Sequence, residues 1–497
     1  MRRIFAVAIA AALAVTFAGT PAGAHAVRSA PGSSGIGDVY FPDYGNGGYD
    51  VGHYDLRLRY WPDSDTLTGT ATILATAIAD LSSFNLDFAL DVSSVRVNNR
   101  AATFARQGDH ELVVSPARAL HTGDAMTIVV QYSGVPSQVK AAGFTAWTRT
   151  HDGALAVGEP EIAWWWFPSN DHPRDKATFD VSVLVPDGTS VLSNGLLTRR
   201  ARPELPGWSR WNWRETKPMA TYLAFLAIGQ YDIATDTSAD GQPIVTAYSK
   251  DLGVEAAAAR ANVERTDEVV DWESTIFGPY PFDARGGVVV ASNTVGYALE
   301  NQTRSVYDGV FWARGDAMYV IVHENAHQWF GDSVSVHNWA DIWLNEGFAS
   351  YAEWLWSQEQ GEGTAQELFD FTYQSHPADD PFWQLKIGDP GAADLFDDPV
   401  YDRGAMALHA LRLQVGDAAF FTILRYWAAQ HALSDGSIAQ FMALAEQVSG
   451  QDLDALFTAW LFTPSRPELG AAAMRAAAPV EPRSWRAIQQ AHANLHH

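Results

Sequence analysis

The stretch that decides the fold of this chain is His323-Glu324-Asn325-Ala326-His327, which is followed by Glu346 within Trp343-Leu344-Asn345-Glu346-Gly347. On a helix, residues i and i+4 lie on one face, so the imidazoles of His323 and His327 can reach a single ion. A catalytic zinc ion takes three protein ligands and keeps one position for water. Glu346, on a second helix, can supply the third ligand, and Glu324 then lies beside the water as a general base. The pattern predicts one zinc ion per chain.

The residues around this motif predict the two helices that the site needs. In residues 317–330, apolar side chains recur at three- and four-residue spacing, and Gly331 can close the C-terminus of the helix. Residues 344–360 have the same spacing and then meet Gly361. Without the second helix the predicted site would lack one ligand.

The sequence pattern changes near residue 235. Upstream, apolar and polar residues alternate, as in residues 53–61 and 178–185, which is typical of half-buried strands. Turn-rich links separate further short strands, so we expect an antiparallel β-sandwich over residues 51–235. Downstream the spacing becomes helical, and residues 236–470 are expected to form the catalytic domain. The predicted fold class is multidomain α+β.

The two ends of the chain differ in composition from the middle. Residues 1–24 combine Arg2-Arg3, an apolar run and Ala22-Gly23-Ala24, which is the plan of a secretory signal peptide. A retained N-terminal anchor is the alternative, although the apolar run is short for a membrane span. Residues 25–50 are rich in glycine and predict a flexible leader, and residues 471–497 predict a tail of uncertain order. We expect a secreted protein without stable membrane insertion.

Composition limits both the chemistry and the partners. The chain has no cysteine, so it forms no disulfide and its zinc ligands can only be His, Glu or Asp. Its formal net charge of −25 disfavours nucleic acid as a partner and favours solubility. We expect a monomer that acts on peptides.

Two blocks around the motif resemble the signature blocks of the aminopeptidase N family, zinc exopeptidases of the gluzincin clan that are related to leukotriene hydrolase. They are His-Glu-Asn-Ala-His-Gln-Trp-Phe-Gly-Asp at residues 323–332 and Trp-Ala-Asp-Ile-Trp-Leu-Asn-Glu-Gly-Phe-Ala at residues 339–349. The resemblance implies a β-sandwich followed by a thermolysin-like, mainly helical zinc domain. Larger members add a C-terminal helical domain that covers the site. The present chain resembles a short form without that domain, so we expect a more open cleft.

The resemblance also implies roles for residues outside the zinc motif. Tyr401 lies in Tyr-Asp-Arg-Gly-Ala at residues 401–405, which matches the segment carrying the family's catalytic tyrosine, and is expected to stabilise an oxyanion. Residues 296–301, Gly-Tyr-Ala-Leu-Glu-Asn, are similar to the Gly-x-Met-Glu-Asn strand that binds the substrate amine. Glu300 is therefore the expected amine ligand, with Ala298 and Asn301 beside the peptide.

A second acidic group for the amine is expected from the sandwich domain. Glu159 and Glu161 both lie in the corresponding segment, and Glu159 aligns slightly better. The sequence leaves the choice between them open.

These residues together predict a secreted zinc-dependent aminopeptidase. A thermolysin-type endopeptidase is one alternative, because it shares the zinc motif; Glu300-Asn301 and the upstream sandwich argue against it. A non-catalytic peptide-binding protein on the same fold is the other. The complete set of ligands, base and tyrosine argues against that second alternative.

Overall fold

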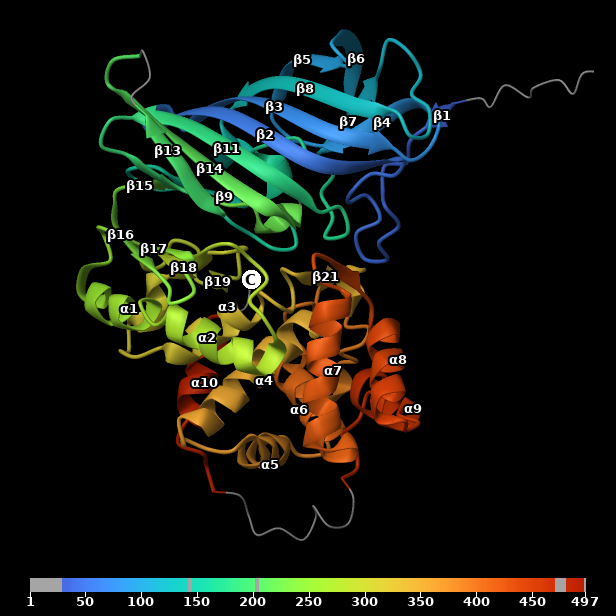
Figure 1. Ribbon diagram of the computed structural model, residues 1–497, viewed down its shortest axis with the longest axis vertical. Coiled ribbons are helices and arrows are strands. Elements are labelled where there is room, and N and C mark those ends of the chain that lie inside the picture. Colours follow the sequence, from blue (N-terminus) through green and yellow to red (C-terminus); the bar gives the residue numbers. More distant parts are fainter. Residues whose placement is uncertain (1–28, 142–144, 202–204, 470–479, 496–497) are drawn as a thin grey trace, which may run out of the picture.

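The computed structural model describes residues 29–141, 145–201, 205–469 and 480–495, so the signal peptide predicted at residues 1–24 lies outside the described ranges. A β-rich N-terminal domain packs against a mainly helical domain (Figure 1). The predicted order of a strand-rich domain and then a helical one is confirmed. Within the described ranges, no helix is both long enough and apolar enough to cross a membrane.

The N-terminal domain is built around an 11-stranded sheet in the order β1-β4-β7-β6-β5-β8-β3-β2-β11-β14-β13. Alternation in β2 buries Tyr54, Leu56 and Leu58, as the sequence predicts. Most neighbouring strands are antiparallel, but β2 pairs with β11, and β1 with β4, in parallel. The strands are β1 (Ala30–Pro31), β2 (Tyr49–Trp61), β3 (Thr66–Ala77), β4 (Leu81–Asp87), β5 (Asp91–Val97), β6 (Arg100–Gln107), β7 (Glu111–Ser115), β8 (Ala125–Gly134), β11 (Ala177–Pro186), β13 (Leu196–Ala201) and β14 (Trp208–Met219).

A smaller sheet forms the second layer of this domain. Its order is β12-β15-β10-β9, with β9 (Trp147–Arg149), β10 (Ala154–Ala156), β12 (Ser190–Leu192) and β15 (Leu226–Gly229). Figure 1 shows β9 and β15 between the large sheet and the helical domain. Because this layer is covered from both sides, every residue of β10 and β15 is buried.

The helical domain begins with a sheet of its own, in the order β16-β17-β18-β20-β19. Its strands are β16 (Tyr231–Thr237), β17 (Pro243–Ser249), β18 (Arg285–Val290), β19 (Ala298–Leu299) and β20 (Ser305–Asp308). The domain boundary expected at residue 235 falls inside β16, which pairs with β17 along its whole length, so the boundary lies before Tyr231. β19 is the outermost strand and leaves one edge of the sheet unpaired by any other described strand.

Helices make up the rest of the domain. They are α1 (Ala256–Val263), α2 (Thr266–Phe277), α3 (Met318–Ala326), α4 (Trp343–Glu359), α5 (Ala365–Ser375), α6 (Asp398–Val415), α7 (Asp417–Gln430), α8 (Ile438–Ser449), α9 (Asp454–Phe457) and α10 (Trp485–His492). The zinc motif lies on α3, which ends before the residue 330 predicted from sequence. The N–H groups of Gln328 and Trp329 bond three residues back, to Asn325 and Ala326, so the chain tightens into a turn there.

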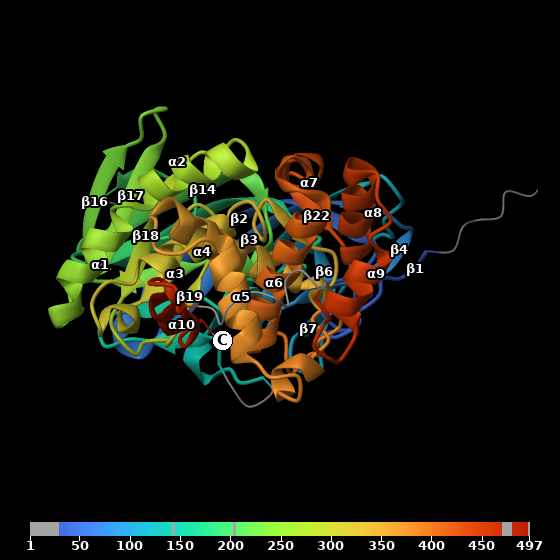
Figure 2. The same ribbon diagram turned by 90° about the horizontal axis from the view of Figure 1, so that it is seen from below.

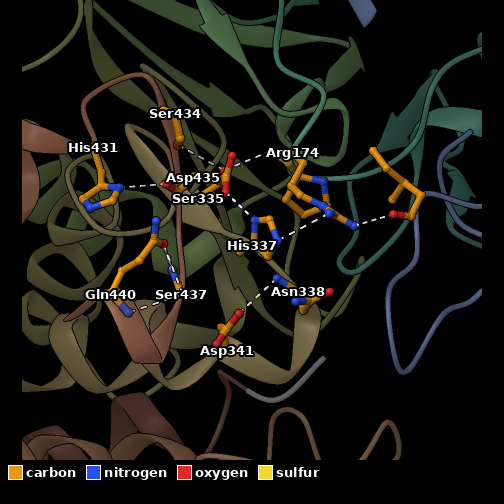
Figure 3. A network of polar contacts seen from close by, with 12 residues as sticks. Arg174, Ser335, His337, Asn338, Asp341, His431, Ser434, Asp435, Ser437 and Gln440 are labelled. Atoms are coloured by element: carbon orange, nitrogen blue, oxygen red, sulfur yellow. Dashed lines mark hydrogen bonds and ion pairs between the residues drawn. The ribbon is translucent and has the colours of Figure 1, made fainter. Parts of the chain in front are cut away.

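A polar network joins the two domains at the strand pair β21 (Val334–Val336) and β22 (Ser434–Gly436) (Figure 3). His337 lies at its centre: Nδ1 is 2.6 Å from Asp435 Oδ1, and Nε2 is 3.4 Å from Arg174 Nη1 of the N-terminal domain. Arg174 also donates to the carbonyl of Ile36, at 2.8 Å. The network therefore connects the segment before β2, the N-terminal domain and the catalytic domain.

The leader predicted to be flexible is packed in its described part. Asp38 is buried, and its Oδ2 accepts hydrogen bonds from His172 Nε2 at 3.1 Å and from the Trp339 N–H at 2.9 Å. Tyr40 donates its hydroxyl to Asp389 Oδ1 at 2.6 Å. Glycine content suggested flexibility, but these side-chain contacts to distant residues fix the segment.

The predicted C-terminal tail likewise contains an ordered part. Residues 480–495 include α10, which packs beside α3 (Figure 2). Ser357 of α4 donates to Ser484 Oγ at 2.7 Å, and the rings of Trp485 and Phe371 meet edge to face with centroids 5.0 Å apart. The C-terminal segment is therefore packed against α4 and α5 of the helical domain.

Candidate active site

The predicted zinc ligands converge at the contact between α3 and α4. His323 Nε2 lies 3.2 Å from Glu346 Oε2, and His327 Nε2 lies 3.4 Å from the same oxygen. One ligand atom from each of the three side chains lies within 4.8 Å of the others, and all three side chains are buried. His323 and Glu346, which are 23 positions apart in the sequence, thus belong to one compact donor set.

Hydrogen bonds on the far side of each imidazole orient its ring. His323 Nδ1 lies 2.6 Å from Glu353 Oε1, and His327 Nδ1 lies 3.0 Å from the carbonyl oxygen of Phe330. Since these acceptors require a proton on Nδ1, Nε2 is the ring nitrogen that faces Glu346 in both histidines, and it becomes available to a metal when its own proton is released. The sequence reasoning missed Glu353, although it follows Glu346 by seven residues, two helical turns along the same face of α4.

The donor set fits a zinc ion. Two neutral imidazole nitrogens and one carboxylate form a known three-ligand catalytic set that leaves a position for water. Burial alone would raise the pKa of Glu346, but the charge of His327 and hydrogen bonds from both histidines hold it below its ordinary value. Conversely, Glu346 raises the pKa of His327 well above its ordinary value against the opposing effect of burial. A dication bound here would therefore be stabilised by the negative charge of these carboxylates.

A narrow cavity lies in front of these ligands. Its lining residues are Ala298, Glu300, His323, Glu324, His327, Glu346, Tyr401 and Leu495. Burial raises the pKa of Glu324 well above its ordinary value, and the neighbouring carboxylates Glu300 and Glu346 add to that shift. A carboxyl group with a raised pKa is suited to accept a proton and to pass it on.

The other end of the cavity is also acidic. Glu300 follows the edge strand β19, and its Oε1 accepts a hydrogen bond from the Tyr222 hydroxyl at 2.9 Å. Burial, and then the charge of Glu300, raise the pKa of Glu159 well above its ordinary value. Glu161 instead responds to burial and to Asp171, which raise its pKa to about 8. The charge of Glu300 therefore acts on Glu159, whereas the charge that acts on Glu161 is that of Asp171.

Ala298 and Asn301, both predicted to lie beside the peptide, have different positions relative to the cavity. Ala298 lines the cavity, whereas Asn301 donates its amide to the carbonyl of Leu223 at 2.9 Å. Asn301 therefore holds the turn after Glu300 against the N-terminal domain and does not line the cavity.

Tyr401 lies in the first turn of α6, and its ring stacks on His323 with centroids 5.9 Å apart. A close helix crossing makes this possible. A Cβ atom added to Gly404 of α6 would lie 2.7 Å from the Cα of Gly347 of α4, so glycine is required for the two helices to approach. The crossing brings the phenol to the wall of the cavity that Glu300 also lines.

Comparison with known proteins agrees with this geometry. Residues 51–223 match the Peptidase M1 N-terminal domain, and residues 262–460 match the Peptidase family M1 domain. The M1 zinc metallopeptidase of Deinococcus radiodurans, solved as a point mutant with a Tyr-Ser-Ala substrate, superposes with a TM-score of 0.77 at 30% identity. That alignment covers 87% of this chain and 99% of the other.

The chain belongs to peptidase family M1.

Curated M1 relatives are longer than this chain. Aminopeptidase M1 of Arabidopsis thaliana is 27% identical over 452 residues, which are 82% of this chain and 49% of the relative. Aminopeptidase N of Streptomyces lividans is 30% identical over 336 residues, 61% of this chain and 38% of the relative. This M1 chain thus spans about half the length, or less, of the curated relatives it matches.

The M1 cavity contains one residue that no sequence signal suggested. Leu495 is 2% exposed and lines the cavity together with Ala298 and Glu300, although it lies outside both matched family domains. Its hydrophobicity alone does not distinguish it from other leucines near the end of the chain.

Proposed function

We propose that this M1 chain is a zinc-dependent aminopeptidase that binds one zinc ion and removes N-terminal residues from peptides. One observation carries the proposal: the predicted zinc ligands and the buried carboxyl group of Glu300 line one narrow cavity. A substrate that bridges the two must present a carbonyl group at one end and a cation close to it. The free N-terminus of a peptide has this structure.

The chain's own residues divide the chemistry among them. Bound to His323, His327 and Glu346, zinc would acidify a water molecule and polarise the scissile carbonyl. Glu324 takes the proton from that water and delivers it to the leaving amine. Tyr401 donates its hydroxyl to the oxyanion that develops on the substrate. Each of these groups is buried, which strengthens its interaction with the developing charge.

The edge strand β19 is the natural guide for the substrate backbone. Its outer edge is free of other described strands, so an extended peptide can pair with it and run toward the metal ligands. Glu300, directly after β19, then binds the α-ammonium group. The short distance from that group to the metal ligands, fixed by the cavity, restricts cleavage to the first peptide bond.

We also propose that the protein is secreted, on the basis of the signal-like residues 1–24. Expression of the full chain in a secreting host, followed by N-terminal sequencing of the protein in the medium, tests this. A secreted species that begins near residue 25 is expected. Retention of the intact N-terminus in the membrane fraction would contradict the proposal.

A panel of fluorogenic aminoacyl amides, with and without a chelator, tests the activity. Hydrolysis should stop on chelation and return on addition of zinc. The same peptide with a free and with an acetylated N-terminus separates the aminopeptidase from a thermolysin-type endopeptidase. Equal cleavage of the two forms would contradict the proposed exopeptidase, and binding without turnover would support the non-catalytic alternative.

A further inference from the structure

The C-terminal helix α10 lies directly against the proposed zinc site. Its apolar face is buried, with Ile488 and Ala491 at 0% and 3% exposure, and its opposite face carries the exposed Arg486. Figure 2 shows α10 beside α3, the helix that carries the first zinc ligand. The chain then continues to Leu495 in the wall of the cavity. This segment is therefore in contact with both the metal-ligand helix and the substrate space.

His492 connects α10 to the ligand His323 through one shared carboxylate. Glu353 Oε1 accepts from His323 Nδ1 at 2.6 Å and from His492 Nε2 at 2.9 Å. The other nitrogen of His492, Nδ1, lies 3.3 Å from Asp402 Oδ1. The contacts thus form a continuous chain from the proposed metal ligand to the residue after Tyr401. Its four side chains are all buried, in the order His323, Glu353, His492 and Asp402.

The position of Glu353 determines the orientation of the His323 ring. Its carboxylate is fully buried, so it has no water to replace a lost hydrogen-bond donor. With His492 in place, Oε1 is held between two ring nitrogens, and His323 keeps the tautomer that offers Nε2 to a metal. Without that donor, Glu353 loses one of the two contacts that fix it.

We propose that His492 is a positioning residue for the zinc site, so that docking of residues 480–495 sets the affinity and the coordination geometry of the metal. The inference rests on the proposed zinc function. It extends that function to a segment outside the matched family domains, which end at residue 460. Because the coupling is reciprocal, zinc should also stabilise the docked position of α10.

A pair of substitutions at one position provides the sharpest test. In His492→Gln, the side-chain amide nitrogen reaches the place of Nε2 and still donates to Glu353. In His492→Asn, the shorter amide reaches the place of Nδ1, so it can serve Asp402 but not Glu353. The two variants are both uncharged amides and differ in the contact that the proposal requires. Gln489→Ala is the matched control, because Gln489 donates to Asp402 at 3.3 Å from the same helix without touching Glu353.

Two readouts other than activity apply. Zinc affinity is measured by competition with a chromophoric chelator, and ligand geometry by the visible spectrum of the cobalt-substituted protein, with circular dichroism as the check on folding. His492→Asn should bind zinc on the order of 10–100-fold more weakly and shift the cobalt bands. His492→Gln and Gln489→Ala should remain close to the wild type. Equal zinc affinity and spectra in the Asn and Gln variants would overturn the proposal.

A measurement on the unaltered protein covers the case in which His492→Asn does not fold. Hydrogen exchange of residues 485–495 should be slower with zinc than without it, relative to the distant helix α8. Identical protection of α10 in the two states would contradict the inference. Failure of the wild type to bind zinc at all would instead contradict the proposed function, so the two failures are distinguishable.

Discussion

The two ends of the cavity are assembled in different ways. The metal end comes from residues 323–346, a single stretch of sequence on two adjacent helices. The amine end combines Glu300, at the edge of the catalytic sheet, with Glu159 of the N-terminal domain, and Tyr222 of that domain bonds Glu300. In the proposed function, metal binding is thus local to one domain, whereas recognition of the substrate amine depends on how the two domains meet.

This difference has a consequence for mutation. Changes at the metal end should alter turnover or metal content whatever the substrate. Changes at the amine end should act on the choice between substrates and leave the metal in place. Each substitution below is expected to alter either turnover and metal content or the choice between substrates. A variant with the effect expected for the other end of the cavity would contradict this division of roles.

Glu324→Gln should have the largest effect. The amide cannot accept the proton of the attacking water, so kcat should fall by roughly 10³–10⁴-fold on every substrate of the panel. Zinc content, measured by atomic absorption, should stay at the wild-type value because Glu324 is not a ligand. Loss of the metal in this variant would mean that the roles of Glu324 and Glu346 have been assigned wrongly.

Tyr401→Phe should come next. It removes one hydroxyl that interacts with the oxyanion only as the charge develops, so kcat should fall on the order of 10²–10³-fold with little change in KM. Steady-state kinetics on a single aminoacyl amide measures both constants. A rise in KM with unchanged kcat would place Tyr401 in substrate binding instead.

Glu300→Ala tests the amine end. It removes a partner of the substrate ammonium, so KM for free N-termini should rise by roughly 10–100-fold while zinc content stays constant. The ratio of rates on free and acetylated forms of one peptide is the sensitive measurement, and it should fall sharply. If the variant keeps the full preference for a free amine, Glu159 carries the recognition alone.

Leu495→Ala should have the smallest effect. Truncation of this side chain enlarges the cavity without removing a polar contact, so relative rates should shift toward bulkier substrates by about 2–10-fold. Rates on alanyl and phenylalanyl amides provide the comparison. An effect on zinc content would show that Leu495 acts on the metal end and not on the substrate space.

Local patterns in the sequence predicted that His323, His327 and Glu346 come together, because helix periodicity places residues i and i+4 on one face whatever surrounds them. The alternation in β2 and β11 predicted the buried faces of those strands for a similar reason. His492 could not be predicted in this way. It lies 139 residues from Glu353, and no periodic pattern relates two residues so far apart. The contact between Asp38 and Trp339 also joins residues far apart in the sequence, so no local pattern predicted it. The glycine-rich composition of the leader suggested flexibility, whereas its buried side chains fix it in place.

The buried Asp38 has a consequence for how the molecule can be shortened. A chain trimmed to start at residue 51, where the family match begins, would keep every proposed catalytic group. It would nevertheless leave the His172 imidazole and the Trp339 N–H without their shared acceptor, in the turn that leads into α4 and Glu346. We therefore expect such a trimmed chain to fold less stably and to hold Glu346 less firmly. We therefore expect the smallest stable unit of this chain to start upstream of residue 51.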